Sequence, residues 1–381
     1  MILIKNVAFS CEETECGGYV CIENEKITEV GYGECGKSAD IVLDGLSGVL
    51  YPGLCDIHTH GAKKTDFTQC STDDAVKLEN WYSSCGVTSV FPTTTTETEE
   101  NILTAVKNIA AASKLVTKVH YDGIHIEGPF LSHEKRGAHN EALLKLPDIG
   151  LVKKIIECAD GLRIRMTLAP ELPGALDFIK ECKKLGVMIT LGHSAADTDT
   201  SLKAINLGAD CITHTFNAMN QLHHRNPGLL GAALAEDVFA EIICDGLHVH
   251  QTAVKLFSKA KGQDKAVLIT DSIILAGCDE RDGVLKSAGE DVCVKDGKIV
   301  TVDSGVLAGS SLKLCDGVLN YAHFCGVTLD EAVKCASANP AKAVGIYDIC
   351  GSIEPGKRAD FALFSRDGKL LHTVCGGKIV L

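Results

Sequence analysis

Short apolar runs alternate with longer amphipathic segments from about residue 53 onward. A short apolar run between turn residues is typical of a buried strand, whereas apolar positions three and four apart predict a helix. Eight strands are predicted in this way, at 54–60, 87–93, 122–129, 164–170, 187–194, 211–217, 239–248 and 266–271. Eight strands that alternate with helices favour a parallel sheet closed into a (β/α)8 barrel of the TIM type.

Helical segments separate these strands, for example at 73–86, 97–113, 175–186 and 251–262. Three of them run to a glycine, Gly86, Gly186 or Gly262, and glycine commonly ends helices. A last helix is predicted over 328–345, where it would complete the outer ring of the barrel.

The two ends of the chain have the pattern of short strands and turns, with Asp367–Gly368 as a hairpin turn. Neither end is long enough to bury a core alone, so we expect both to form one small β-sandwich. The predicted organisation is therefore 1–52 and 351–381 for the sandwich and 53–350 for the barrel. A hairpin over 292–300 is expected to leave the barrel after its eighth strand.

Composition and charge exclude several classes of protein. Hydrophobic residues make up 45% of the 381 residues, enough for a large core, and the formal net charge of −13 argues against nucleic acid or an anionic membrane as partner. No secretion signal or membrane-spanning run is recognisable, so we expect a soluble, cytoplasmic protein. Eighteen cysteines without a single C-x₂-C pair favour reduced thiols over zinc fingers or a disulfide framework.

The stretch "GYGECGKS", Gly31–Ser38, matches the phosphate-loop pattern G-x-x-x-x-G-K-[ST]. That motif binds phosphate at the N-terminus of a following helix. Here a short strand and a Gly/Pro-rich turn follow instead, so we interpret the match as a chance turn sequence.

Candidate chemistry begins in "LCDIHTH", residues 54–60, where Asp56, His58 and His60 occupy every second position. In a strand these three side chains point to one face. Buried polar groups need partners, and a bound metal ion would supply one. Asp56, and His125 two residues before Glu127, either orient neighbouring ligands or form ordinary structural hydrogen bonds.

Active sites of these barrels lie at the carboxyl ends of the strands. Five predicted strands carry metal-capable side chains at that end: His58, His60, Glu127, His193, His214 and Asp271. Imidazoles with carboxylates suit Zn²⁺ or Fe²⁺ better than Ca²⁺ or Mg²⁺. We expect one or two ions, the first held by His58, His60 and Asp271, the second by His193 and His214, with Glu127 between them.

Several motifs together resemble the amidohydrolase superfamily and, within it, the N-acetylglucosamine-6-phosphate deacetylase family. They are "VLYPGLCDIHTHG" (49–61), "HIEGPF" (125–130), "KRGAH" (135–139), "LGHS" (191–194), "THTFNAM" (213–219), "HHRNPG" (223–228), "DGLHVH" (245–250), "LITD" (268–271) and "GSIEPGKRADFALF" (351–364). Many superfamily members bridge two ions with a carboxylated lysine. No strand end here offers a lysine, so Glu127 is expected to take that place.

The resemblance implies hydrolysis of N-acetylglucosamine 6-phosphate to glucosamine 6-phosphate and acetate. The cation would lower the pKa of water so that hydroxide attacks the acetyl carbonyl, with Asp271 as proton acceptor and then donor. The resemblance also implies the substrate-binding residues, which are His139, Asn217, Ala218, Arg225, His248 and Leu307. In this family such an arginine reaches across a dimer interface, so a homodimer is expected, whereas His223 and His224 receive no role.

Two alternatives stay open. One is another enzyme of the superfamily, such as a cyclic amidase or a nucleobase deaminase, although Arg225 and His248 would serve a phosphate better than a neutral ring. The other is a barrel that acts only as an interaction scaffold. Such a scaffold would not need the six candidate metal-site residues.

Overall fold

The computed structural model describes residues 1–287, 289–303, 305 and 307–381. Its largest sheet runs β10-β9-β11-β12-β13-β14-β15-β16, with β6 also paired to β9. The eight strands of the barrel are β6 (Leu54–Thr59), β9 (Val87–Thr94), β11 (Gly123–Glu127), β12 (Arg163–Leu168), β13 (Met188–Leu191), β14 (Cys211–Ile212), β15 (Phe239–Ile243) and β16 (Ala266–Ile269). All are parallel, which confirms the predicted (β/α)8 barrel. Strand β10 (His120–Tyr121) is a short addition beside β9.

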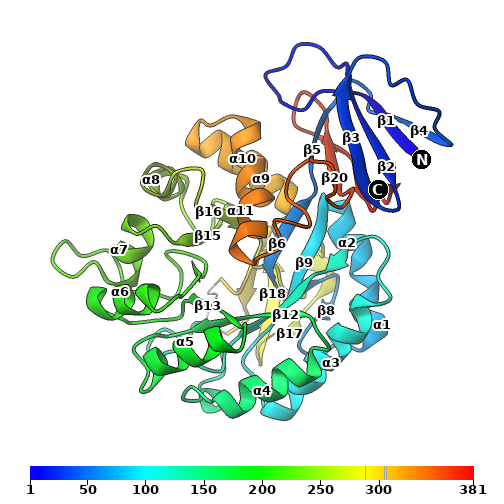
Figure 1. Ribbon diagram of the computed structural model, residues 1–381. Helices are drawn as coiled ribbons and strands as arrows, with labels where there is room; N and C mark the ends of the chain where they lie inside the picture. Colours follow the sequence, from blue (N-terminus) through cyan, green and yellow to red (C-terminus); the bar gives the residue numbers. More distant parts are fainter. Residues whose placement is uncertain (288, 304, 306) are drawn as a thin grey trace.

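Helices surround the barrel (Figure 1). They are α1 (Thr72–Lys77), α2 (Glu79–Ser84), α3 (Glu99–Ser113), α4 (Ile149–Cys158), α5 (Ala175–Lys184), α6 (Thr198–Asn206), α7 (Gly228–Ala235), α8 (Gln251–Lys261) and α9 (Leu314–Cys325). Thr98 and Asp197 cap α3 and α6 by accepting hydrogen bonds from backbone N–H groups of the first turn. Gly86, Gly186 and Gly262 have φ values of 77°, 75° and 69°, a backbone that favours glycine and that ends the preceding helices.

The stretch 328–345 is largely helical, as predicted, but it does not form one continuous helix. The structure has two, α10 (Leu329–Ala336) and α11 (Ala338–Ala343), separated at Ser337. Pro340 explains the break, because a proline inside a continuous helix would clash with the carbonyl of Ala336, four residues earlier. In the first turn of a new helix the same proline is tolerated.

Both ends of the chain build a second unit beside the barrel (Figure 1). One sheet has the order β3-β2-β1-β4 and the other β22-β21-β20-β5. Their strands are β1 (Ile2–Val7), β2 (Gly18–Glu23), β3 (Lys26–Tyr32), β4 (Ile41–Asp44), β5 (Val49–Pro52), β20 (Phe361–Phe364), β21 (Leu370–Cys375) and β22 (Lys378–Ile379). Val20 and Ile27 of the first sheet share a buried cluster with Leu50 and Phe361 of the second, as expected of a sandwich. The domain boundaries at 52/53 and 350/351 stay predictions.

The hairpin predicted over 292–300 follows the eighth barrel strand, and a third strand joins it. The three strands are β17 (Leu285–Ser287), β18 (Glu290–Lys295) and β19 (Lys298–Thr301). Val292 and Ile299 of this sheet pack against Ile273 and Leu275, next to the end of β16. The smaller elements are β7 (Gly61–Ala62), β8 (Thr65–Asp66), η1 (Glu141–Leu143) and η2 (Glu280–Asp282).

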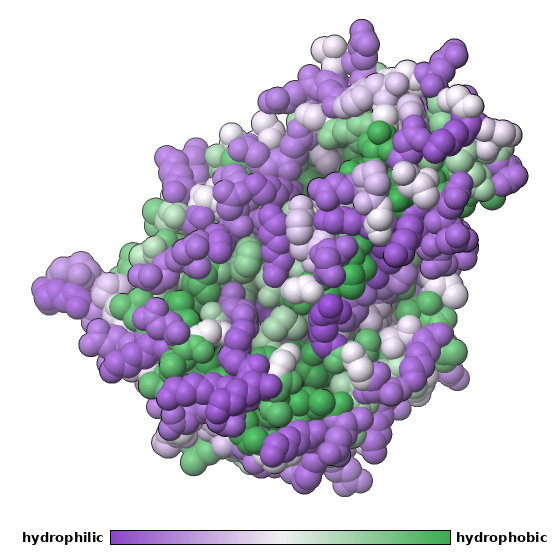
Figure 2. Space-filling view, viewed as in Figure 1, coloured by the Kyte–Doolittle hydropathy of each residue, from purple (hydrophilic) through white to green (hydrophobic). Residues whose placement is uncertain are grey.

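Gly31–Ser38 is not followed by a helix, since β3 ends at Tyr32 and the next element is strand β4. Lys37 forms an ion pair with Glu29 instead of facing a phosphate site. Within the described ranges, every helix is too short or too polar to traverse a lipid bilayer. On the face shown in Figure 2, hydrophilic residues cover the protruding parts and hydrophobic ones lie mostly in the recesses between them.

Candidate metal centre and active site

Glu127 closes β11 and lies at the centre of a cluster of imidazoles. Five histidine Nε2 atoms lie within 3.5 Å of its carboxylate: those of His58 (3.3 Å), His193 (3.3 Å) and His214 (3.2 Å) near Oε1, and those of His60 (3.0 Å) and His139 (3.5 Å) near Oε2. Burial opposes ionisation, but His58 and the other imidazoles lower the pKa of Glu127 well below its ordinary value. The residues predicted to hold metal therefore meet at one point.

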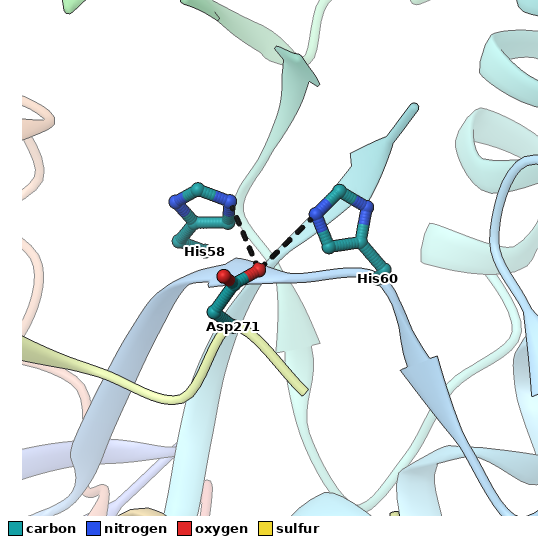
Figure 3. A group of neighbouring side chains, drawn as sticks. All are labelled: His58, His60 and Asp271. Carbon is teal, nitrogen blue, oxygen red and sulfur yellow. Dashed lines mark ion pairs between the residues drawn. The ribbon is translucent and has the colours of Figure 1, made fainter. Parts of the chain in front are cut away.

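Asp271 completes this cluster on one side. Figure 3 shows its carboxylate between the rings of His58 and His60, with Oδ1 3.5 Å and 3.3 Å from their Nε2 atoms. Burial opposes its charge, but these two histidines lower the pKa of Asp271 to about 2, so the group is a carboxylate at neutral pH. The predicted set of His58, His60 and Asp271 is thus assembled around one small space.

The donor atoms fit a bound cation. Among the described residues, Nε2 of His58 and Oε1 of Glu127 are buried and have no hydrogen-bond partner, although they face each other. Burial alone would lower the pKa of His58, but the carboxylates of Glu127, Asp271 and Glu241 raise it well above the ordinary value. The surroundings therefore favour positive charge, and nitrogen and carboxylate ligands are those that Zn²⁺ or Fe²⁺ binds.

Hydrogen bonds at Nδ1 of three of these rings distinguish candidate metal ligands from a candidate proton donor. Nδ1 of His193 lies 2.9 Å from the carbonyl of Lys135, and Nδ1 of His58 lies 3.0 Å from Oε2 of Glu241. An Nδ1–H that donates to an oxygen leaves Nε2 with a free lone pair for a metal. Burial lowers the pKa of His193 to about 4, which keeps that ring neutral.

His139 is arranged in the opposite way. Its Nδ1 accepts a 3.3 Å hydrogen bond from the backbone N–H of Thr96. A neutral ring whose Nδ1 accepts carries its hydrogen on Nε2. His139 therefore presents an N–H donor to the centre.

Three of these residues lie just beyond their strands in a backbone conformation that such residues rarely adopt. His193, His214 and Asp271 have φ values of 47°, 25° and 49°. Positive φ outside glycine costs free energy and persists where the surrounding structure imposes it, often at functional sites. Here the strand breaks at the point where each side chain turns into the mouth of the barrel.

A cavity of about 310 Å³ opens above the cluster. It is lined by most of the predicted site residues, which are His60, Glu127, His139, His193, His214, Asn217, Ala218, His248, Asp271 and Leu307. His58 lies fully buried beneath them. Burial opposes the charged form of His248, but the carboxylate of Asp245, 2.6 Å from Nδ1, raises its pKa.

Arg225 is the exception among the predicted substrate contacts. It lies on an exposed loop, outside the residues that line the cavity, and its Nη1 is 2.8 Å from Nε2 of the neighbouring His224. Within one chain it is therefore not placed to hold a ligand of this cavity.

Asp56 and His125 support the centre from below. Asp56 accepts a 2.6 Å hydrogen bond from Oγ1 of Thr270 and so links β6 to the end of β16. The ring of His125 packs edge-on against that of His58, with centroids 4.5 Å apart, and its Nε2 bonds Oγ1 of Thr167. Asp56 thus joins the ends of two strands, whereas His125 restricts the ring of a candidate metal ligand.

Sequence reasoning missed Glu241 and Arg165, two buried, oppositely charged residues inside the barrel. The available signal was a single charge within each of the apolar runs "FAEIIC" and "IRMTL". A separate group, His120, Asp360 and Cys375, lies where barrel and sandwich meet. Its carboxylate is already paired with Arg358, which also binds Asp122, so this group is accounted for as a structural network.

The chain is similar to known proteins over most of its length. A model described as "Amidohydrolase family" matches residues 49–380. The N-acetylglucosamine-6-phosphate deacetylase of Bacillus subtilis (strain 168) is 36% identical over 99% of this chain and 96% of that protein. The N-acetylgalactosamine-6-phosphate deacetylase of Escherichia coli O157:H7 is 36% identical over 82% of each.

Solved structures agree with these sequence matches. The N-acetylglucosamine-6-phosphate deacetylase from Pasteurella multocida superimposes with a TM-score of 0.92 at 30% identity and covers 99% of both chains. The chain therefore belongs to the amidohydrolase family and is a hydrolase related over its full length to the N-acetylglucosamine-6-phosphate deacetylases.

Proposed function

We propose that the chain hydrolyses N-acetylglucosamine 6-phosphate to glucosamine 6-phosphate and acetate with the help of one or two divalent cations, Zn²⁺ or Fe²⁺. The observation that carries this proposal is the convergence of Glu127, Asp271 and the surrounding imidazoles below a cavity of about 310 Å³. The full-length deacetylase relatives support the choice of substrate. A cation bound there would lower the pKa of water and polarise the acetyl carbonyl.

Asp271 is the proposed acid and base. Its side chain lies in the cavity wall and is 15% exposed, so it can reach both water and substrate. The carboxylate would take a proton from the attacking water as the oxygen bonds to the acetyl carbon. The same proton would pass to the nitrogen as the C–N bond breaks, so that one group serves both steps.

His139 is the proposed donor to the oxygen that gains charge during this attack. Its Nε2 carries hydrogen, because Nδ1 accepts from Thr96, and the ring lies in the cavity wall. A donor held in place before the reaction stabilises developing negative charge without reorganisation. Leu307, also in the wall, would border the acetyl methyl group.

Binding of the phosphate requires positive charge and N–H donors. Asn217, the backbone at Ala218 and His248 line the cavity and are the proposed contacts from the same chain. Neither Lys nor Arg appears among the described residues of this lining. We therefore propose that Arg225 acts from the second subunit of a homodimer, where its planar fork suits phosphate oxygens.

The direct test combines elemental analysis of the purified protein with an acetate-release assay on N-acetylglucosamine 6-phosphate. We expect one or two equivalents of Zn or Fe and stoichiometric acetate and free amine. Metal-loaded protein that releases no acetate would refute the proposed function. Eighteen free cysteines suit the reducing conditions of the cytoplasm, where we propose that the reaction takes place.

N-Acetylgalactosamine 6-phosphate is a second candidate substrate, favoured by the E. coli relative at the same 36% identity. The two sugars differ only in configuration at C4. A comparison of kcat/KM for both sugars in one acetate-release assay decides between them.

A further inference from the structure

Arg165 and Glu241 form an ion pair inside the barrel, below the metal centre. Arg165 lies on β12 and Glu241 on β15, and their side chains are only 2% and 0% exposed. Removing two charges from water is costly, and a buried ion pair often stabilises a fold no better than apolar side chains of the same size. Stability therefore does not explain the pair. Its other hydrogen bonds show which residues it contacts and so indicate its role.

Those hydrogen bonds lead to two proposed metal ligands. Oε2 of Glu241 lies 3.0 Å from Nδ1 of His58 and accepts a 3.1 Å hydrogen bond from the backbone N–H of His214. The carbonyl of Glu241 accepts another from the N–H of Thr215, at 2.9 Å. Arg165 donates through Nη1 to the carbonyl of Ile57, at 3.2 Å, and so holds the residue before His58.

We propose that the Arg165–Glu241 pair is a positioning device that orients ligands of both proposed cation sites. Glu241 fixes the Nδ1–H form of His58, which turns the Nε2 lone pair toward Glu127 and Asp271. The same carboxylate holds the backbone of His214 at a φ of 25°, which the residue would not adopt unaided. Arg165 neutralises Glu241 and anchors it from the opposite side.

The inference rests on the proposed cation sites, and its test uses metal rather than substrate. E241D keeps the charge that neutralises Arg165 but shortens the side chain by one methylene, so its oxygen draws back from His58. We expect the Zn²⁺ affinity of the full-length, metal-stripped protein, measured by competition with a chelating dye, to fall about 10- to 100-fold. Unchanged affinity overturns the proposal.

D360N is the matched control, because it also weakens a buried ion pair, that of Asp360 with Arg358, but contacts none of the proposed ligands. We expect D360N to lower the melting temperature measured in chelator and to leave the Zn²⁺ affinity unchanged. If E241D behaves like D360N in both measurements, the Arg165–Glu241 pair is only structural and the proposal is wrong.

A second measurement needs no folded variant of Glu241. In the Zn²⁺-loaded protein with ¹⁵N-labelled histidines, His58 should give the NMR signature of a ring protonated at Nδ1, assigned by its loss in H58N. A His58 ring protonated at Nε2 overturns the proposal. Neither readout involves the sugar. Protein that binds Zn²⁺ but releases no acetate would therefore refute the proposed function and leave the positioning role of Arg165 and Glu241 intact.

Discussion

The backbone N–H of Asp271 donates a 2.9 Å hydrogen bond to the carbonyl of His58. Residues at the ends of the first and eighth strands are thereby joined, and Oδ1 of Asp271 comes within 3.5 Å of Nε2 of the same histidine. Closure of the barrel thus brings Asp271 next to His58, its proposed partner in metal binding. Mutations at this contact test the chemistry, provided that their effects on folding are measured separately.

Asp271→Asn removes the proposed acid and base while it keeps the size of the side chain. We expect kcat for acetate release to fall about 10²- to 10⁴-fold, the range typical of general acid–base groups. Elemental analysis and the melting temperature should show that fold and bound metal are largely retained. Full turnover in this variant would contradict the proposed mechanism.

Asp197→Asn is a suitable comparison, because Asp197 caps α6 on the surface and touches no site residue. Asn is an equally good cap residue, so both activity and melting temperature should remain.

Arg225→Ala tests the proposed phosphate contact. We expect KM for the sugar phosphate to rise about 10- to 100-fold, as for the loss of a hydrogen bond between charged groups, with kcat nearly unchanged. The exposed Arg163, which starts β12 at the opposite end of the barrel, provides the control, and Arg163→Ala should leave KM unaltered. An equal loss toward unphosphorylated N-acetylglucosamine would discredit the phosphate contact.

Mixing two impaired variants, assayed at a sugar-phosphate concentration well below the KM of R225A, shows which subunit supplies this arginine. In a mixed dimer of R225A and D271N, the subunit with an intact Asp271 faces a partner with an intact Arg225. If Arg225 acts across the interface, that site is complete and activity returns on mixing. Activity that stays at the level of the separate variants places Arg225 in its own subunit or excludes it from the site.

Removal of metal should inactivate and destabilise the protein together. A ligand present at 100 times its Kd stabilises the folded state by about 2.7 kcal/mol. We therefore expect dialysis against a chelator to abolish acetate release and lower the melting temperature, and Zn²⁺ or Fe²⁺ to restore both. Activity that survives exhaustive chelation, verified by elemental analysis, would rule out the cation.

The contribution of Asp360, at the junction of barrel and sandwich, to the free energy of unfolding should depend on pH. Burial opposes ionisation of Asp360, but Arg358 and His120 lower its pKa to about 2. Such a carboxyl stabilises the fold above its ordinary pKa of about 4 and loses that contribution, about 2 kcal/mol, as the pH falls through 2. Urea unfolding from pH 6 to pH 2.5 should therefore give a difference between unaltered protein and D360N that shrinks with acidity. A constant difference would show that the charge of Asp360 is not its source.

The strands and most of the candidate metal-binding cluster follow from the sequence because each depends on local pattern. Apolar runs of strand length, separated by amphipathic helices, specify the barrel, and barrel geometry then brings His58, Glu127 and Asp271 together at one end. Helix breaks are harder to locate. The pattern over 328–345 is helical throughout, and only the position of Pro340 reveals that two helices share it.

Features that depend on contacts between distant strands could not be predicted. Arg165 and Glu241 are each a lone charge in an apolar strand, and nothing in either stretch says that they lie opposite each other. The left-handed backbone of His193 and His214 is equally hidden, because nothing in their local sequence requires it and the surrounding network imposes it. Arg225 differs again, since its proposed ligand lies outside its own chain.

The sandwich has a consequence for synthesis of the protein. The apolar side of the N-terminal sheet, with Val20 and Ile27, is covered by Leu50, Phe361 and Val374, and the last two are synthesised only after the barrel. During translation of the barrel, Leu50 of β5 is the only one of these covering side chains already made, so most of that apolar surface lacks its native cover. A nascent chain stalled before β20 should therefore bind chaperones or aggregate through residues 1–44, however well its barrel has formed.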